Sequence, residues 1–391
     1  MKLLLVEPEY RGHHIALHLN LILNEAFKRN WEIIILTKKK MLTSKAYNLI
    51  NKEIKKKIKF FYIKDKKLNN HRNYFYLFYI QWNNYKSILN SLNKIILSEN
   101  PDHVYFVTLD HIDKILSIMK FPFNSPIISG LLIYSKIHLK NNFINLFKKF
   151  LFTRLLKSTF IKNIFVVDES LYKFCKSNLK TNKIIYTPDP GKVYYKFSKK
   201  KCRTKFNLSN NDFVILVYGA IKNSKGIYEL LNALNDIKKN NIKVIIAGEQ
   251  TNDIKLFLEN KLSKYLIDNN RLIIEEGFQN YKQEAALFAI TDVVWIAYNN
   301  DFYGSSSVLY QAGSVKKPVI TNNNGLIGSI NNKYKVGLSV NLSVKESIIK
   351  QITLLYQNVK IRKKLALNNF LLSKNHSGEN FAKLICDKII L

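Results

Sequence analysis

Two loops in the second half of the sequence hold residues that can bind a phosphate group. The loop 219–234 reads GAIKNSKGIYELLNAL; it opens with Gly219 and places Lys225 beside Gly226 at the expected start of a helix. Because amides at a helix N-terminus and an ammonium group both attract anions, this loop predicts a site for a diphosphate. The alternative is an ordinary turn with a solvated lysine, which a lysine-rich chain also produces.

The second loop, 301–320, reads DFYGSSSVLYQAGSVKKPVI. Gly304 and three serines open an expected helix, and their amides and hydroxyls can form another anion-binding turn. Further along this helix, Gln311 can hydrogen-bond the hydroxyls of a ribose, although a glutamine on a helix is usually solvated. The pattern GxSxG is absent, so these serines do not predict a nucleophile elbow. The three serines are Ser305, Ser306 and Ser307.

In the first half, three loops after expected strands carry candidate groups for an acceptor or a transferred sugar. The loop PEYRGHH (8–14) has Gly12 for a tight turn, followed by His13 and His14 as hydrogen-bond partners. Asp110 in TLDH and Tyr134 in LLIYS follow two other strands. His13, Asp110 and Tyr134 are the predicted catalytic residues. For Asp110 the favoured alternative is N-cap of a helix over 111–119, since aspartate there contributes about 1 kcal/mol.

No metal or cofactor site is predicted. No two aspartates are spaced as DxD, the arrangement that holds a diphosphate through a divalent ion. A GxGxxG fingerprint and a P-loop are also absent, which argues against dehydrogenases and Walker-type ATPases. Cys175, Cys202 and Cys386 have no CxxC spacing, so neither zinc nor disulfides are expected.

The composition is that of a folded but strongly basic chain. Of 391 residues, 47% are hydrophobic, and 62 Lys and Arg stand against 28 Asp and Glu, a net charge of +34. Such a charge attracts nucleic acid, anionic lipid or anionic small molecules. The basic residues are spread through every segment without a recognition module, so nucleic acid is not an expected partner. The apolar run at the N-terminus is too short for a signal peptide, so a cytoplasmic protein is expected.

Short apolar runs alternate with longer helical patterns along the whole chain. This alternation predicts βαβ units and parallel sheets, an α/β fold. A turn-rich, lysine-rich stretch at 187–210 is poor material for a core and predicts a linker. We expect domains at 1–190 and 191–370, with a last helix at 371–391. The expected strands lie at 2–8, 31–37, 103–109, 126–132, 163–169, 213–219, 243–249, 271–277, 292–298 and 317–321.

The second half resembles the donor domain of the GT-B glycosyltransferases, in particular the large retaining group numbered family 4. The resemblance rests on ordered segments between 213 and 330: VYGAIKNSKGIYELLNAL, VIIAGE, EGF, DVVWIAY and SSSVLYQAGSVKKPVITNNNGLIG. The first half is similar more loosely, through RGHH and TPDP. The resemblance implies two Rossmann-like domains facing each other across a cleft, the first binding the acceptor and the second a nucleotide sugar. The last helix would pack back on the first domain.

In that family a lysine before a glycine binds the donor diphosphate, and Lys225 matches it. The arginine that usually follows the preceding glycine is replaced by Ala220. Of two glutamates separated by seven residues, the second binds ribose; Tyr303 and Gln311 occupy these positions, with Asp301 near the first. The predicted donor site therefore comprises Gly12, Gly219, Lys225, Gly226, Tyr303, Gly304, Ser305, Ser306, Ser307 and Gln311.

The implied reaction is metal-independent, hexosyltransferase-like transfer from a UDP- or GDP-linked sugar to a glycan or lipid-linked acceptor in surface polysaccharide biosynthesis. Configuration would be retained, with the departing phosphate helping to deprotonate the acceptor. Two alternatives share the fold. A sugar-nucleotide epimerase needs no acceptor, and a non-catalytic nucleotide-sugar-binding protein would suit the replacements at Ala220, Tyr303 and Gln311.

The segment 141–160 reads NNFINLFKKFLFTRLLKSTF and predicts a basic amphipathic helix. Such a helix can lie on an anionic membrane, which would place the protein on the inner face of the cytoplasmic membrane near a lipid-linked acceptor. The equally favoured alternative is that its apolar side packs on the first sheet.

Overall fold

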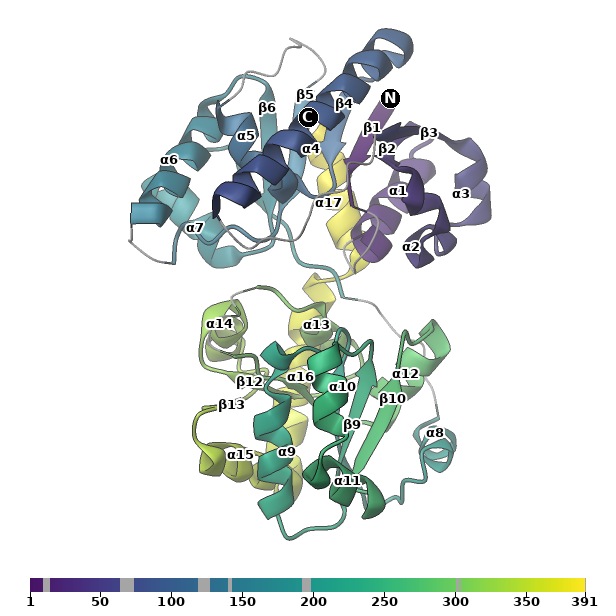
Figure 1. Ribbon diagram of the computed structural model, residues 1–391, viewed down its shortest axis with the longest axis vertical. Coiled ribbons are helices and arrows are strands. Elements are labelled where there is room, and N and C mark those ends of the chain that lie inside the picture. Colours follow the sequence, from purple (N-terminus) through teal and green to yellow (C-terminus); the bar gives the residue numbers. More distant parts are fainter. Residues whose placement is uncertain are drawn as a thin grey trace. The chain divides into compact units, whose positions relative to one another are not determined.

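The chain folds into two compact units, each an α/β structure (Figure 1). The computed structural model describes residues 1–9, 15–63, 74–118, 127–139, 143–191, 198–299, 302 and 304–390. Unit 1 contains Met1–Asp189 and Gly378–Leu391, and unit 2 contains Pro190–Ser377. The expected fold class, two Rossmann-like domains with parallel sheets, is confirmed. No helix in these described ranges is long and apolar enough to span a bilayer.

Unit 1 is built on a seven-stranded sheet of order β3-β2-β1-β4-β5-β6-β7, in which every neighbouring pair is parallel. Leu4 and Val6 of the first strand join the core on one face, and Leu3 and Leu5 join the core on the other. Burial on both faces explains why this strand is a continuous apolar run. The strands are β1 (Lys2–Glu7), β2 (Glu32–Lys38), β3 (Ile58–Ile63), β4 (His103–Phe106), β5 (Ile127–Leu132), β6 (Ile161–Val166) and β7 (Ile184–Tyr186).

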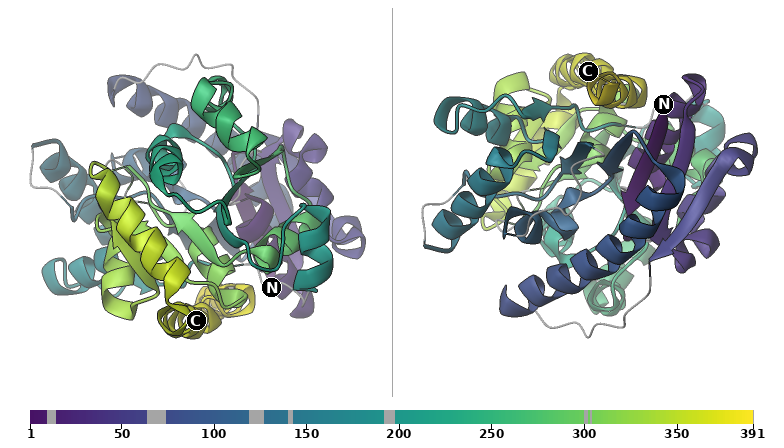
Figure 2. Two further views of the ribbon diagram at one scale, coloured as in Figure 1. Left: turned by 90° about the horizontal axis from the view of Figure 1, so that it is seen from below. Right: turned by 90° about the horizontal axis from the view of Figure 1, so that it is seen from above.

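Helices cover both faces of this sheet (Figure 2). The C-terminal helix α17 (Gly378–Ile390) packs against α1 (Asn20–Lys28). Its apolar residues Phe381, Leu384, Ile385 and Ile389 all contact the core that contains Leu3 and Leu5. A π-helical turn, Ile15–Leu19, precedes α1. The other helices are α2 (Lys45–Asn48), α3 (Lys52–Lys57), α4 (Tyr74–Glu99), α5 (Asp113–Ile118), α6 (Phe143–Lys157) and α7 (Glu169–Asn178), with 3-10 turns at Lys39–Thr43 and Leu109–His111.

Unit 2 has a six-stranded parallel sheet of order β10-β9-β8-β11-β12-β13. It too lies between two apolar cores, with helices on both faces (Figure 2). The strands are β8 (Phe213–Tyr218), β9 (Ile242–Gly248), β10 (Leu272–Glu276), β11 (Val293–Ile296), β12 (Val319–Asn322) and β13 (Gly337–Val340). The helices are α8 (Lys199–Lys205), α9 (Ile227–Asp236), α10 (Asn252–Leu258), α11 (Lys261–Asp268), α12 (Tyr281–Ile290), α13 (Ser307–Ser314), α14 (Gly325–Tyr334), α15 (Lys345–Gln357) and α16 (Val359–Asn375).

Two expectations about organisation need correction. The basic stretch expected as a linker contains α8, and Arg203 of this helix is buried, where it donates to the carbonyl of Asp212 and pairs with Asp292. A buried guanidinium with these partners is part of the core of unit 2. The helix expected at 371–391 is two helices, because α16 continues to Asn375 in unit 2 and α17 begins at Gly378 in unit 1.

The structure adds three strands that the sequence pattern did not predict: β3, β7 and β13. All three lie at an edge of their sheet. Edge strands are less completely buried, so their sequences lack the continuous apolar run that marks the central strands.

Candidate functional site

Both sheets share one strand order, and it locates a site in each unit. Counted within its own unit, each sheet runs 3-2-1-4-5-6, with a seventh strand added in unit 1. The direction of winding reverses between β1 and β4 in unit 1 and between β8 and β11 in unit 2. Open α/β sheets bind ligands beyond the carboxyl ends of the strands at such a reversal. The described candidate residues lie at or near these two places.

In unit 2, two glycines shape the loop that leaves β8. Gly219 has a φ of 100°, a conformation that favours glycine. Gly248, at the end of the neighbouring β9, has a φ of 139°, and a Cβ on it would lie 1.8 Å from the carbonyl oxygen of Gly219. The two strand ends therefore approach so closely that a side chain at Gly248 cannot be accommodated. This approach fixes the backbone from which the loop 219–226 departs.

Lys225 is buried at the centre of this loop, with 7% of its surface exposed. Its Nζ donates to the carbonyl oxygen of Tyr218 at 2.8 Å and lies 3.3 Å from the hydroxyl of Tyr298. The indole N–H of Trp295 donates to the backbone carbonyl of Lys225, which fixes the residue from the other side. Gly226 follows with a φ of 59° and is the N-cap residue of α9. The alternative prediction, that Lys225 is solvated in an ordinary turn, is therefore wrong, because this ammonium group is held beside the ends of β8 and β11.

Tyr298 connects the lysine to the serine-rich turn. Its hydroxyl lies 3.0 Å from Oγ of Ser306, and Lys225 lies over its ring at 5.0 Å. The ring of Phe302 stacks on Tyr298 with centroids 4.0 Å apart. Ser306 is the residue before α13, and its hydroxyl is turned to Tyr298 instead of capping the helix. Gly304, Ser305 and Ser307, which flank it, are half-buried.

Gln311 lies in the interior of unit 2, with 1% of its surface exposed. Its Nε2 donates to Oε1 of Glu284 on α12 at 3.2 Å. Burial and the Glu284 carboxylate, which accepts a hydrogen bond from the Tyr218 hydroxyl, raise the pKa of Tyr218. The alternative prediction, that Gln311 is a solvated residue on the helix surface, is therefore wrong. The hydrogen bond to Glu284 fixes the orientation of the Gln311 amide, so ribose binding by Gln311 would depend on Glu284.

In unit 1, the structure brings two predicted residues together. Asp110 follows β4, and its two carboxylate oxygens accept hydrogen bonds from the backbone N–H groups of Ile133 and Tyr134, each at 2.8 Å. Tyr134 follows the neighbouring strand β5, and its side chain is exposed. The expected N-cap role of Asp110 is wrong, because α5 begins at Asp113 and the carboxylate instead holds the loop after β5.

Two carboxyl groups in this region have raised pKa values. Burial, helped by the neighbouring charge of Asp113, raises the pKa of Asp110 from 3.8 to about 7. Burial raises the pKa of Glu7, the last residue of β1, to about 8. Glu7 accepts hydrogen bonds from the hydroxyl of Thr108 and the amide of Glu9. Carboxyl groups that titrate near neutral pH gather at functional sites, because they can exchange protons there.

A third carboxylate in this region belongs to Asp189, in the segment TPDP. Nε2 of His18, on the π-helical turn, lies 3.5 Å from Oδ1 of Asp189, and both side chains are almost completely buried. Partial desolvation of its hydroxyl by neighbouring protein raises the pKa of Tyr134 to about 12, and the negative charges of Asp110, Asp189 and Glu7 contribute in that order. Unit 1 thus presents acidic groups beyond its strands where unit 2 presents a lysine.

Three predicted site residues lie outside the described residues: Gly12, His13 and Tyr303. The same holds for His14 and Asp301. In the described ranges, the sequence pattern missed Glu7, Tyr298 and Glu284. Two of them had a signal, since Glu7 is the acidic end of the first apolar run and Tyr298 ends the expected strand 292–298. Glu284 lies within a helix of ordinary composition and had none.

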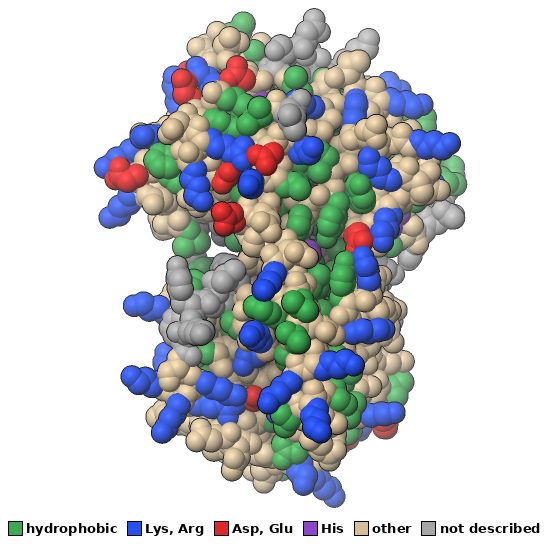
Figure 3. All heavy atoms as spheres, turned by 180° about the vertical axis from the view of Figure 1, so that it is seen from behind, with side chains coloured by type: hydrophobic (Ala, Val, Ile, Leu, Met, Phe, Trp, Pro, Cys, Tyr) green, Lys and Arg blue, Asp and Glu red, His purple; other side chains and the backbone are tan. Residues whose placement is uncertain are grey.

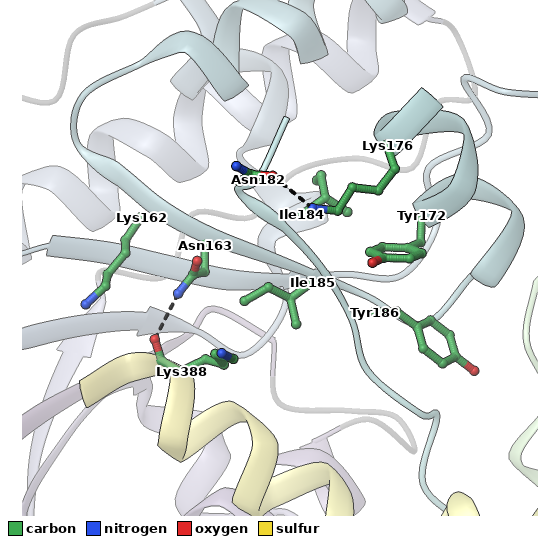
Figure 4. A pocket seen from close by; sticks show the side chains of 9 residues that line it. All are labelled: Lys162, Asn163, Tyr172, Lys176, Asn182, Ile184, Ile185, Tyr186 and Lys388. Carbon is green, nitrogen blue, oxygen red and sulfur yellow. Dashed lines mark hydrogen bonds between the residues drawn. The ribbon is translucent and has the colours of Figure 1, made fainter. Parts of the chain in front are cut away.

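A pocket of about 590 Å³ lies elsewhere in unit 1, along the edge strand β7 (Figure 4). Lys176 Nζ donates to Oδ1 of Asn182 at 3.2 Å, and Asn163 donates to the carbonyl of Lys388 at 2.8 Å. None of the predicted site residues lines this pocket. Its lining consists of Lys162, Asn163, Tyr172, Lys176, Asn182, Ile184, Ile185, Tyr186 and Lys388.

The large positive charge is not confined to either site. Lys and Arg side chains are spread over the faces of both units that Figure 3 shows, among few Asp and Glu. The net charge of +34 is therefore a property of the whole surface. What distinguishes the unit 2 site is one buried lysine with defined partners.

Comparisons with known proteins agree with this arrangement. Residues 198–370, within unit 2, match the family model of glycosyl transferases group 1. No curated protein sequence matches the chain. Among solved structures, the chain is similar to HepE from Anabaena in complex with UDP, with a TM-score of 0.73, 15% identity and 100% of both chains covered.

Two further structures have the same two-domain architecture. WaaG, a glycosyltransferase involved in lipopolysaccharide biosynthesis, has a TM-score of 0.68 and 13% identity over 99% of both chains. A glycosyltransferase from Rickettsia africae ESF-5 has a TM-score of 0.67 and 17% identity over 99% of this chain and 97% of its own. At these identities the likeness shows the fold, and the family model adds the activity. The chain is a glycosyltransferase with the GT-B fold, and residues 198–370 of its C-terminal unit match the group 1 glycosyl transferases.

Proposed function

We propose that this glycosyltransferase transfers a sugar from a UDP- or GDP-linked donor to a lipid-linked or glycan acceptor of a surface polysaccharide. The transfer retains configuration and needs no metal. The observation that carries this proposal is Lys225, buried beyond β8 with its ammonium group beside the hydroxyl of Tyr298, which in turn hydrogen-bonds Ser306. A fixed cation among hydroxyl donors suits the two negative phosphates of a nucleotide sugar.

The choice of donor draws on the structural relatives. HepE is similar to this chain over its full length, and its structures contain UDP and UDP-glucose. The serine-rich turn before α13, which Ser306 joins to Tyr298, supplies additional amides and hydroxyls at Gly304, Ser305 and Ser307. These groups support a diphosphate held by side chains and backbone in place of a metal ion.

The acceptor side is proposed to lie in unit 1, around Asp110 and Tyr134. Asp110 positions the loop that carries Tyr134, whose side chain is exposed to solvent. Carboxyl and phenol groups hydrogen-bond sugar hydroxyls, and the pKa of Asp110 at about 7 lets it accept or release a proton near neutral pH.

The proposed reaction proceeds on one face of the sugar. The bond between the anomeric carbon and the phosphate oxygen breaks, and its electron pair remains on the phosphate. The acceptor oxygen forms the new bond on the same face, and its proton passes to the departing phosphate oxygen. Lys225 stabilises the charge that develops on the diphosphate, a contribution that can reach several kcal/mol.

A surface polysaccharide is proposed as the product because WaaG, a structural relative, acts in lipopolysaccharide biosynthesis. The acceptor of such a pathway is commonly carried on a lipid, so the enzyme would work at the cytoplasmic face of a membrane. The basic helix α6 supplies a surface for this location, which is argued below.

The experiment is a thermal-shift screen of UDP-, GDP-, ADP- and CMP-sugars, followed by turnover assays with the sugar nucleotide that stabilises the protein. Ligand bound to the native state raises its stability. Transfer to a lipid extract with retained configuration, unaffected by EDTA, would support the proposal. Conversion of the donor without acceptor would indicate an epimerase, and binding without turnover a non-catalytic binding protein.

A further inference from the structure

One face of helix α6 is apolar and uncovered. Four residues at helical spacing, Phe143, Leu146, Phe147 and Phe150, are between 44% and 86% exposed; we call them the α6 apolar face. The opposite side of the same helix is buried, where Leu151, Phe152, Leu155 and Leu156 pack on unit 1. The helix therefore has two apolar sides. The alternative that its apolar residues only pack on the sheet accounts for the second side and leaves the first unexplained.

Large apolar side chains are rarely exposed together without a partner. Isolated exposed residues need no explanation, but a contiguous apolar patch marks an interaction surface. Here three phenylalanines and a leucine fall within the first two turns of one helix, at the edge of unit 1 (Figure 1). Ile144, which is 50% exposed, extends the patch at the helix start.

The charges around this face are all positive on its own helix. Lys148, Lys149, Arg154 and Lys157 belong to α6, and the helix contains no acidic residue. Arg154 and Lys157 are exposed and continue the same side of the helix as the apolar face. Burial and the nearby charges of Lys114 and Lys136 lower the pKa of Lys148, while Asp113 acts in the opposite direction, so two further cations and one carboxylate lie beside the helix.

We propose that the α6 apolar face is a docking surface for an anionic lipid bilayer. Aromatic and aliphatic side chains at its N-terminal end enter the boundary between headgroups and acyl chains, while Arg154 and Lys157 pair with lipid phosphates. Phenylalanine with flanking cations is the combination that such a boundary attracts, whereas a protein partner would not require the positive rim. The inference deepens the proposed function, on which it rests for its purpose: it would bring the enzyme to a lipid-linked acceptor.

Flotation of the full-length protein with vesicles tests this directly, without nucleotide or acceptor. The vesicles contain phosphatidylglycerol in one series and only phosphatidylcholine in the other. We expect binding to the anionic series at low salt that weakens as salt rises. Phe143→Ser/Phe147→Ser should lower the partition coefficient at least about tenfold, since both side chains leave the apolar phase. Arg154→Gln/Lys157→Gln should lower it about fivefold for each cation removed.

Matched controls separate this surface from general stickiness and general charge. Leu97→Ser/Leu256→Ser removes two exposed leucines from α4 and α10, and Lys363→Gln/Lys364→Gln removes two exposed lysines from α16. Neither control should change vesicle binding. Because the α6 substitutions are at exposed positions, the melting temperatures should stay close to that of the unchanged protein.

Three results would overturn the proposal: no flotation with anionic vesicles at low salt, equal losses in the controls and the α6 variants, or a dimer in solution that Phe143→Ser/Phe147→Ser dissociates. The last result would assign the face to a second copy of the chain. Nucleotide-induced thermal shifts, measured in parallel, report on the proposed function. The two proposals can therefore be tested separately: the protein can fail to bind vesicles and still bind the donor, or bind vesicles and fail to bind the donor.

Discussion

The two units use one strand order for opposite electrostatic purposes. At the reversal between β8 and β11, unit 2 holds a buried lysine beside the backbone carbonyl of Tyr218 and the phenol of Tyr298, which is joined to Ser306. At the reversal between β1 and β4, unit 1 holds Glu7 and Asp110, whose pKa values are raised by burial. The sheet supplies the place for a ligand in both cases. The side chains on the loops decide whether that place suits an anion or exchanges protons.

Under the proposed function, this difference corresponds to separate tasks for the two units. A nucleotide diphosphate carries negative charge and is suited to the lysine of unit 2. An acceptor is an alcohol that gives its proton to the departing phosphate in the proposed reaction, and the carboxyl and phenol groups of unit 1 are suited to hydrogen-bond and orient its hydroxyls. Substitutions that exchange or remove these charges therefore test the assignment.

The largest expected effect comes from Lys225→Ala. It removes the only described lysine at the end of β8 that is buried among these hydroxyls, so we expect donor affinity to fall about 100-fold, equivalent to the loss of one strong charged contact of about 3 kcal/mol. Titration calorimetry with the nucleotide found in the thermal-shift screen measures the change.

Lys222→Ala is the control for the preceding prediction, because Lys222 belongs to the same loop but is exposed. It should change the affinity less than about threefold, as expected of a solvent-screened charge. Equal effects from both substitutions would mean that the loop contributes only general positive charge.

A smaller effect is expected from Asp110→Asn in unit 1. If this carboxyl group takes part in proton exchange, kcat should fall about tenfold to 100-fold, and the ionisation near pH 7 should vanish from its pH profile. Asp113→Asn should keep the ionisation but move it to lower pH, because the charge of Asp113 helps to raise the pKa of Asp110. A profile that keeps its ionisation in Asp110→Asn would remove Asp110 from the reaction.

An effect on stability is expected from Gln311→Glu, which tests the pair that Gln311 forms with Glu284. A second carboxylate at this position would face Glu284 in the interior, and we expect unfolding free energy to fall by about 2 to 3 kcal/mol at neutral pH. The double substitution Glu284→Gln/Gln311→Glu restores one amide and one carboxylate and should recover most of the loss. Strictly additive effects in this double-mutant cycle, measured by denaturant unfolding, would contradict the pairing.

The sequence predicted the central part of both sheets and missed parts of their edges. Central strands such as β1 and β8 are buried on both faces, so nearly every residue is apolar and the pattern is unmistakable. Strand β3 reads IKFFYI with exposed positions inside it, and β7 has three residues. An edge strand is defined by the neighbour it pairs with, and a local pattern does not contain that information.

The site was predictable to the extent that its residues lie in one loop. Lys225 and Gly226 are adjacent in sequence, and their position after a strand was readable from the alternation of elements. Tyr298, the partner of Lys225, and Ser306, the partner of Tyr298, lie more than 70 residues away, and only the fold brings them together. For Asp110, the local sequence predicted a helix cap, and this prediction was wrong. Its carboxylate instead accepts hydrogen bonds from residues 23 and 24 positions later in the chain, which the local sequence does not indicate.

A last test of unit 1 concerns the pH dependence of its stability and not its activity. Glu7 has a pKa of about 8 in the folded chain against an ordinary value of 4.5, so between these values the native state binds a proton that the unfolded state has released. Stability must then fall as pH rises across that window, by up to about 1.4 kcal/mol per pH unit from this group. Asp110 contributes in the same direction between 3.8 and about 7.

Glu7→Gln removes the larger of these two contributions and keeps the shape of the side chain. The amide oxygen can still accept from the N–H of Glu9, and the amide nitrogen can donate to the hydroxyl of Thr108. Unfolding free energies measured from pH 5 to about 8 should therefore decline less steeply with pH in the variant. The difference in slope should correspond to roughly one bound proton. Glu53→Gln, at an exposed position of α3, should leave the slope unchanged. If Glu7→Gln also leaves it unchanged, Glu7 is ionised in the folded chain, and the contrast between an acidic, proton-exchanging unit 1 and a cationic unit 2 would rest on Asp110 alone.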